Sequence, residues 1–197
     1  MANTLKLIIC GDILVGKTSI IRKYMEQSND YLPTIGIATY RTKINVRGEE
    51  TVLDIYDTAG DERYRSILPA FFRRANVAIV VFSIDRHETY EHLQYWANTL
   101  DDYCPDILRI LVCNKIDLDH KISEEELRMA QSIFGVNQLV MTSAITGEGI
   151  QEIFNIISDS DIQLPETVPG IPTEEFNEAF KDDKKNSGYC SYCYSFF

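Results

Sequence analysis

A stretch that could bind phosphate lies near the start of the chain. "GDILVGKT" (Gly11–Thr18) has the pattern G-x-x-x-x-G-K-T, after an apolar run and at the start of a helix-like segment. In this context, successive backbone N–H groups and the helix N-terminus surround an anionic phosphate. Lys17 would reach the β- and γ-phosphates of a nucleotide, and the Thr18 hydroxyl would bind Mg²⁺. The alternative is a chance glycine turn, which the flanking strand and helix patterns disfavour.

A second group of residues could recognise guanine. "NKID" (Asn114–Asp117) follows an apolar run, and so does "TSA" (Thr142–Ala144). A fixed carboxylate accepts two N–H bonds from the edge of guanine, which adenine does not offer, so Asp117 would read the base. The stem of Lys115 would lie over the ring, Asn114 would tie the loop to its neighbours, and the alanine N–H of "TSA" could meet the guanine carbonyl. For the tetrapeptide alone, a polar surface loop is the alternative.

Two further stretches could complete a site for a metal ion and a terminal phosphate. In "DTAG" (Asp57–Gly60), Asp57 could hold Mg²⁺ through water and the Gly60 N–H could sense a γ-phosphate. "LPTIG" (Leu32–Gly36) supplies Thr34 as a second hydroxyl for the metal, in a loop whose proline and glycine suit a change of backbone conformation. An ordinary glycine turn is the alternative for "DTAG" in isolation.

The elements that must position these residues follow from the hydrophobic pattern. Apolar runs alternate with helix-like periods, which predicts an α/β domain with a mostly parallel sheet. The runs on either side of "RGEE" are expected to form a hairpin. A capping box is expected to open the helix at 123–134. Strands are expected at 5–10, 39–46, 51–56, 77–84, 107–113 and 137–142, and helices from about residue 17 and at 87–100, 123–134 and 147–157.

The bulk properties narrow the class of protein. The 197 residues carry a net charge of −11, which argues against nucleic acid as a partner and against simple electrostatic attachment to an anionic membrane. No stretch approaches the roughly 20 apolar residues of a membrane span, and the N-terminus lacks the features of a signal peptide. Cys10 and Cys113 are expected to be buried in strands of a reduced, cytosolic protein. We expect one domain at 1–158 and a flexible tail at 159–197.

The four motifs together resemble, in their order and spacing, a small GTPase of the Ras superfamily, with Rab as the most similar branch. "LDIYDTAGDERYRSI", "FFRRANVAIVVFSI" and "ETYEHLQYW" resemble Rab segments, and the resemblance extends over about residues 5–158. It implies a P-loop NTPase G domain, with a six-stranded, mostly parallel sheet, one antiparallel edge strand and about five helices on both faces. It also implies a switch that binds Mg²⁺ with GTP or GDP and recruits effectors in intracellular vesicle traffic.

The same resemblance implies partners and site residues. Partners would be effectors, an exchange factor, an activating protein and an escort or dissociation-inhibitor protein, in the cytosol and on the cytoplasmic face of intracellular membranes. The expected catalytic residues are Lys17, Thr34, Gly60 and Asp61, and the expected metal ligands are Thr18, Thr34 and Asp57. The expected nucleotide-binding set is Leu14, Val15, Gly16, Lys17, Thr18, Ser19, Thr34, Gly60, Asn114, Lys115, Asp117, Ser143 and Ala144.

Departures from the family pattern surround the expected γ-phosphate. Asp61 stands where the family usually has a glutamine that orients the attacking water, and a carboxylate can neither donate an amide hydrogen bond nor approach phosphate without repulsion. Ile13 and Leu14 replace small residues and would crowd an activator's arginine. We therefore predict slow intrinsic hydrolysis; neutral divergence is the alternative. Activators of Rab proteins can supply their own glutamine, so assisted hydrolysis stays open.

The base and the tail also differ from the family. No clear aromatic side chain is in place to pack on guanine, since Gln27 stands near that position between Tyr24 and Tyr31, which predicts fast nucleotide exchange. Cys190 and Cys193 are candidates for lipid attachment, although a C-a-a-X box needs Cys fourth from the end. A redox pair, half of a zinc site, or docking of the aromatic ending into a protein groove are the alternatives. One prenyl chain alone anchors only marginally.

Three functions follow from these residues. The first is a GTPase that cycles and recruits effectors through exposed apolar side chains near its loops. The second is a GTP- or GDP-loaded scaffold that turns over too slowly to cycle alone. The third is a P-loop kinase for a small molecule, which "NKID" and "TSA" disfavour. The expected effector residues are Ile35, Ile37, Tyr56 and Phe71, with partial burial against the sheet as the alternative.

Overall fold

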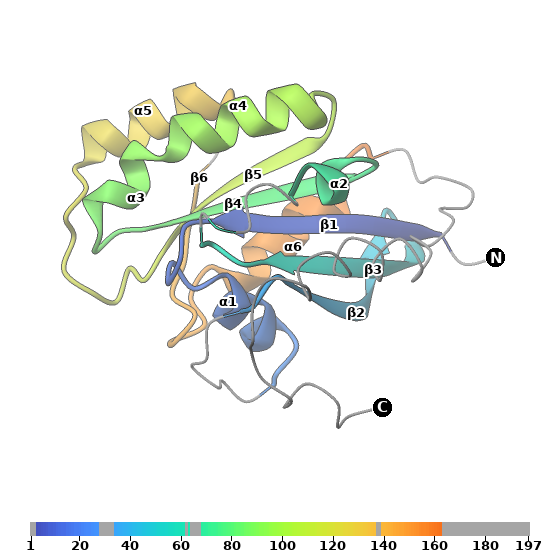
Figure 1. Ribbon diagram of the computed structural model, residues 1–197. Helices are drawn as coiled ribbons and strands as arrows, with labels where there is room; N and C mark the ends of the chain where they lie inside the picture. The colour runs from blue at the N-terminus through green and yellow to red at the C-terminus, as the bar shows by residue number, and fades with distance from the viewer. Residues whose placement is uncertain (1–2, 28–33, 62, 64–67, 137–138, 163–197) are drawn as a thin grey trace, which may run out of the picture. The chain divides into compact units, whose positions relative to one another are not determined.

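Apolar strands form a six-stranded sheet within the described part of the chain (Figure 1). The strands lie in the order β2-β3-β1-β4-β5-β6, and all neighbours are parallel except β2 and β3. The structure is a computed structural model that describes residues 3–27, 34–61, 63, 68–136 and 139–162. The strands are β1 Thr4–Gly11, β2 Ile37–Val46, β3 Glu49–Thr58, β4 Val77–Ser83, β5 Leu108–Asn114 and β6 Leu139–Met141.

The sheet owes its parallel centre to strands that are apolar on both faces. Every residue of β4 is buried, as helices cover both sides of a parallel sheet. The edge strand β2 instead alternates exposed with less exposed residues and carries the ion pair Arg41–Asp54 to its neighbour. β2 and β3 form the expected hairpin, and both turn residues, Arg47 and Gly48, have positive φ, as a type I′ turn requires.

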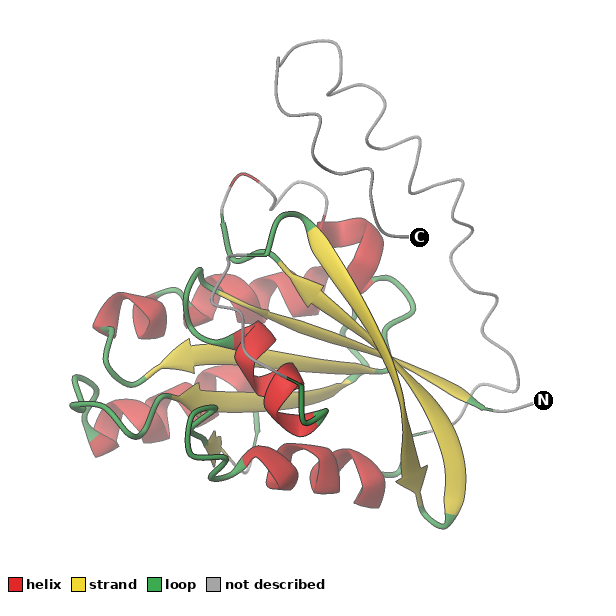
Figure 2. Ribbon diagram, turned by 90° about the horizontal axis from the view of Figure 1, so that it is seen from below, coloured by secondary structure: helices red, strands yellow, loops and turns green. Residues whose placement is uncertain are grey.

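Helices cover the two faces of the sheet and create two cores (Figure 2). One core packs α1 and α6 on the sheet through residues such as Ile20 and Phe154, and the other packs α2, α4 and α5 through Phe72, Trp96 and Phe134. The helices are α1 Lys17–Tyr24, α2 Leu68–Phe72, α3 His87–Glu91, α4 Leu93–Tyr103, α5 Glu124–Phe134 and α6 Ile150–Asp159.

The structure confirms the predicted fold class and several local predictions. Ser123 and Glu126 form the expected capping box, and Cys10 and Cys113 are buried free thiols. One difference concerns the helix expected over 87–100, which the structure divides into α3 and α4 at His92, where the backbone leaves regular helical geometry. Residues 1–166 form one compact unit, and the division at residue 158 stays a prediction. Among the described residues, no helix is long and apolar enough to cross a membrane.

Candidate nucleotide-binding site

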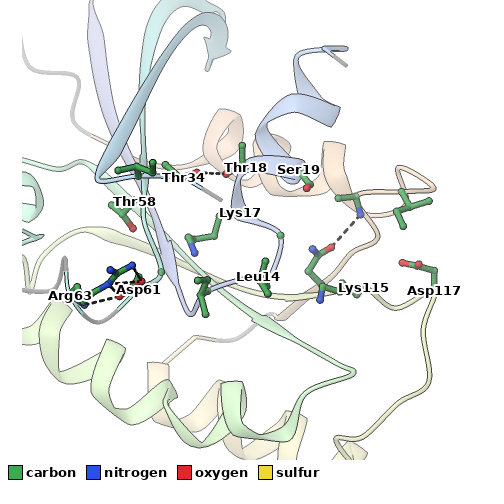
Figure 3. A pocket seen from close by; sticks show the side chains of 17 residues that line it. Leu14, Lys17, Thr18, Ser19, Thr34, Thr58, Asp61, Arg63, Lys115 and Asp117 are labelled. Carbon is green, nitrogen blue, oxygen red and sulfur yellow. Dashed lines mark hydrogen bonds and ion pairs between the residues drawn. The ribbon is translucent and has the colours of Figure 1, made fainter. Parts of the chain in front are cut away.

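A cavity of about 540 Å³ lies where β1, β3, β5 and β6 lead into loops (Figure 3). This is the edge at which open parallel sheets bind ligands, and the volume suits a small molecule. The cavity is lined by Ile13, Leu14, Gly16, Lys17, Thr18, Ser19, Thr34, Ile35, Thr58, Gly60, Asp61, Arg63, Asn114, Lys115, Asp117, Ala144 and Ile145.

Most of the predicted site residues therefore share one cavity. The exceptions are Val15, Asp57 and Ser143, which are fully buried and do not line the cavity. In Figure 3, Lys17 lies between the Asp61–Arg63 pair at one end and Asp117 at the other. The predicted phosphate and base residues thus lie along one continuous surface.

Lys17 brings a buried positive charge to the cavity wall. Its Nζ donates to the backbone carbonyls of Gly11 and Asp12, at 2.9 and 2.7 Å. Burial lowers the pKa of Lys17 to about 8, and the nearby carboxylate of Asp57 opposes that shift. An ammonium held by neutral carbonyls in a pocket of low polarity is suited to bind an anion.

The turn before Lys17 depends on a glycine. Gly16 has φ of 100°, and a Cβ at this position would lie 2.2 Å from Nδ2 of Asn114. A side chain here would thus be strained by its own backbone and would collide with a buried amide. Helix α1 then begins at Lys17, so its first N–H groups lie at the cavity.

Three oxygen-bearing side chains converge beside Lys17. The Thr18 hydroxyl donates to Oδ2 of Asp57 at 2.6 Å, and the Thr34 hydroxyl lies 2.8 Å from that of Thr18 and 3.1 Å from the same carboxylate oxygen. Asp57 is fully buried, and its Oδ1 has no hydrogen-bond partner among the described residues. Burial raises the pKa of Asp57, and the hydrogen bond from Thr18 and the positive charge of Lys17 act against this increase. An all-oxygen set with an unsatisfied carboxylate oxygen suits a hard divalent cation such as Mg²⁺.

Asn114 joins three loops at the other end of the cavity. Its Nδ2 donates to the carbonyl of Val15 at 2.8 Å, while its Oδ1 accepts from the Thr142 hydroxyl at 3.0 Å and from the Ala144 N–H at 3.2 Å. The expectation that Asn114 ties its loop to its neighbours is confirmed. The Ala144 N–H, expected to face a guanine carbonyl, donates to Asn114 in this structure.

The residues after Asn114 turn toward the cavity. Lys115 has a left-handed backbone with φ of 66°, and its Nζ lies 3.5 Å from Oδ1 of Asp85. Asp117 follows at the end of the cavity (Figure 3). Ser143 is buried and accepts a hydrogen bond from the N–H of Thr146, so it supports the conformation of its own loop.

Asp61 is paired with an arginine of its own loop. Nε of Arg63 lies 3.0 Å from both carboxylate oxygens, its Nη2 donates to Oδ2 at 2.7 Å, and its backbone N–H donates to Oδ1 at 2.9 Å. These hydrogen bonds lower the pKa of Asp61 to about 2, so the carboxylate is ionised at neutral pH. The residue at this position therefore offers acceptors only, and those acceptors are directed at Arg63.

The remaining candidate residues from the sequence lie in different environments. Ile13 and Leu14 line the cavity and are 39% and 62% exposed. Tyr24, the last residue of α1, is partly buried and stacks on Phe154 of the core with ring centroids 3.4 Å apart. Gln27 is exposed just after that helix. Tyr31, Cys190 and Cys193 lie outside the described residues.

A comparison of the sequence with models of known protein families gives a match that covers most of the fold. A family model described as "Ras family" matches residues 6–162. The chain belongs to the Ras family. Members of this family are GTPases that bind GTP and GDP, which agrees with a cavity built from a phosphate-binding loop, an oxygen cluster and a base-side loop.

The relatives of this Ras-family protein indicate which branch of the Ras superfamily it resembles. "Ras-related protein Rab-18" of Caenorhabditis elegans is 33% identical over 173 residues, which cover 83% of both chains. Its counterpart in Caenorhabditis briggsae is 32% identical over 173 residues, with the same coverage. "Ras-related protein Rab-18-B" of Danio rerio is 33% identical over 169 residues, covering 83% of this chain and 82% of the relative. The protein is thus a Rab-like GTPase of the Ras superfamily.

Some residues at the cavity were not anticipated from the sequence. Thr58 lines it, with its hydroxyl bound to the carbonyl of Ile9 at 3.0 Å. Ile145 lines the base side and is 64% exposed. Arg63 lines the phosphate side; the opposite charges at positions 61 and 63 were the signal for this pair, although spacing alone does not fix a loop rotamer.

Proposed function

We propose that this Rab-like GTPase is a guanine-nucleotide switch that binds Mg²⁺ with GTP or GDP and recruits effectors in intracellular vesicle traffic. The observation that carries the proposal is the convergence of Thr18, Thr34 and Asp57 beside Lys17, with one buried carboxylate oxygen that has no partner in the described part of the chain. The three come from the phosphate-binding loop, the "LPTIG" loop and the end of β3, so one metal ion would connect all three segments.

The residues have distinct tasks in this switch. Lys17 and the N–H groups of Leu14 to Ser19 bind the phosphates, and Thr18, Thr34 and Asp57 hold Mg²⁺, which when bound neutralises developing phosphate charge. Asp117 reads guanine, with Lys115, Asn114, Ser143 and Ala144 shaping the base side. Gly60 and Thr34 contact the γ-phosphate of bound GTP. Their loops are released when that phosphate is lost.

Intrinsic hydrolysis is slow in this proposal. A glutamine at position 61 would orient the attacking water with its amide, whereas the Asp61 carboxylate accepts hydrogen bonds from Arg63. Ile13 and Leu14 line the cavity with exposed, bulky side chains, which would leave little room for an activator's arginine. The same observations favour a second candidate, a GTP-loaded scaffold that does not cycle unaided.

Partner binding would use apolar side chains next to the moving loops. Ile35 is 81% exposed, while Tyr56 and Phe71 are partly buried with their ring centroids 6.2 Å apart. Such a surface suits effectors, an exchange factor, an activating protein and an escort or dissociation-inhibitor protein. Two modified cysteines, Cys190 and Cys193, would supply the membrane attachment that places the protein on the cytoplasmic face of intracellular membranes.

The test is single-turnover hydrolysis of Mg²⁺·GTP by the wild type and by Asp61→Gln, after binding of GTP and ATP has been compared. We expect preference for GTP, slow wild-type hydrolysis and hydrolysis about tenfold faster in the variant, which is less than the roughly 10²–10⁴-fold that a positioned proton-transfer group contributes. Asp106→Gln, at an exposed position before β5, is the matched control. Preference for ATP would overturn the switch; equal rates in wild type and Asp61→Gln would overturn the role of Asp61.

A further inference from the structure

Side chains from the segment after β4 contact the start of the phosphate-binding loop. Nε1 of Trp96 donates to Oδ1 of Asp12 at 3.1 Å. Nδ1 of His92 lies 2.5 Å from Oδ2 of the same carboxylate, and because a carboxylate only accepts, the imidazole donates. Nη1 of Arg86 donates to the carbonyl of Ile13 at 2.9 Å. Two adjacent loop residues are thus tied to the α3–α4 region.

These contacts solve an electrostatic problem at Asp12. The residue is 7% exposed, and a buried carboxylate next to a phosphate site would repel the phosphates unless it were turned away and compensated. Both oxygens have a donor on the α4 side, which also removes the cost of burying them unsatisfied. Trp96, itself 1% exposed, cannot leave this position without opening the core.

The opposite side of Asp12 faces the functional residues. Its backbone carbonyl accepts from Nζ of Lys17 at 2.7 Å. A Cβ on Gly60 would lie 2.3 Å from the Asp12 carbonyl and from the N of Ile13, so the backbone of the "DTAG" segment is packed directly against these residues. Any shift of Asp12 would therefore displace the partner of Lys17 and the surface on which Gly60 rests.

We propose that His92 and Trp96 are positioning residues that hold the phosphate-binding loop through Asp12 and thereby slow release of the nucleotide. The inference rests on the proposed nucleotide binding. Neither residue lines the cavity, so both act through Asp12 rather than by touching a ligand. Arg86 supports the same loop one residue further along.

The experiment compares dissociation of fluorescently labelled GDP, in the presence of Mg²⁺, from the full chain and two variants of His92. His92→Leu removes the donor at a half-exposed position, whereas His92→Asn restores an N–H at the place of Nδ1. We expect release about tenfold faster from His92→Leu, equivalent to about 1.4 kcal/mol, and a rate within about threefold of wild type for His92→Asn. Gln94→Leu, at an exposed position two residues later in α4 and bonded to Asn98, is the matched control.

The outcomes separate this inference from the proposed function. Failure of the wild type to bind GDP would overturn the nucleotide switch itself. Binding by the wild type with unchanged release from His92→Leu would overturn the positioning role alone. Equally fast release from both variants would mean that the hydrogen bond to Asp12 is not the cause. Trp96→Phe removes the second donor to the same carboxylate, and it too should speed release. Release at the wild-type rate from both Trp96→Phe and His92→Leu would refute the inference, and misfolding of a variant could not explain that result.

Discussion

Asn114→Ala tests how strongly one buried amide joins the loops around the cavity. The side chain is 1% exposed and makes hydrogen bonds to Val15, Thr142 and Ala144. Each such bond contributes about 1 kcal/mol net, so their removal should cost about 3 kcal/mol of unfolding free energy. For a chain of this size, that corresponds to a fall in Tm of roughly 6–12 °C.

The assay is thermal unfolding in one nucleotide-free buffer, because a bound ligand would add its own stabilisation to each protein. Asn98→Ala is the control: Asn98 is exposed and accepts a hydrogen bond from Gln94 at 2.9 Å, so its loss should change stability by no more than about 0.5 kcal/mol. Release of labelled GDP should also accelerate in Asn114→Ala, since the Val15 contact links the base side to the phosphate side.

A loss of less than about 1 kcal/mol would refute the reasoning, because even one unsatisfied buried partner costs that much. It would mean that Val15, Thr142 and Ala144 find other partners when the amide is removed. A full loss of stability with unchanged nucleotide release would show instead that Asn114 supports the fold without coupling the two ends of the cavity.

Two further predictions concern the moving loop and a surface pair. Gly60→Ala would place a Cβ 2.3 Å from the backbone of Asp12, against 3.4–4 Å for ordinary contact; single-turnover hydrolysis should fall about 100-fold, as a misplacement of about 1 Å typically causes, with GDP binding retained. The hydrogen bond to Glu126 raises the pKa of His87 above 6.5, so this pair stabilises the fold fully below that value and the contribution is lost as the pH rises through the raised pKa. Tm measured from about pH 6 to about pH 9 should fall more in the wild type than in Glu126→Gln, which keeps the capping box; parallel curves would contradict this assignment.

Most of the candidate site could be predicted from short motifs, because the chemistry of each motif depends on residues that are adjacent in the sequence. Gly16, Lys17 and Thr18 are positioned by the turn from β1 into α1, and a strand followed by that motif leaves little choice of backbone. The hairpin turn at Arg47 and Gly48 is local in the same sense. The roles of these residues in nucleotide chemistry stay predictions until binding is measured.

Contacts between distant segments could not be predicted in this way. Tyr24 looked like a candidate near the base, but its ring stacks on Phe154, which lies 130 positions later in the chain. The expected helix over 87–100 divides at His92, and that residue bonds to Asp12 in the first loop. Helical spacing cannot reveal such partners, because tertiary packing decides them.

The position of Trp96 has a practical meaning. It is the single tryptophan of the chain, its indole is enclosed in the core, and its N–H is bonded to a residue of the phosphate-binding loop. Indole emission responds to charge and hydrogen bonding at the ring, so the unlabelled protein carries its own optical probe of that loop. Emission from one defined site would follow loading and release in real time, without a dye that perturbs the nucleotide.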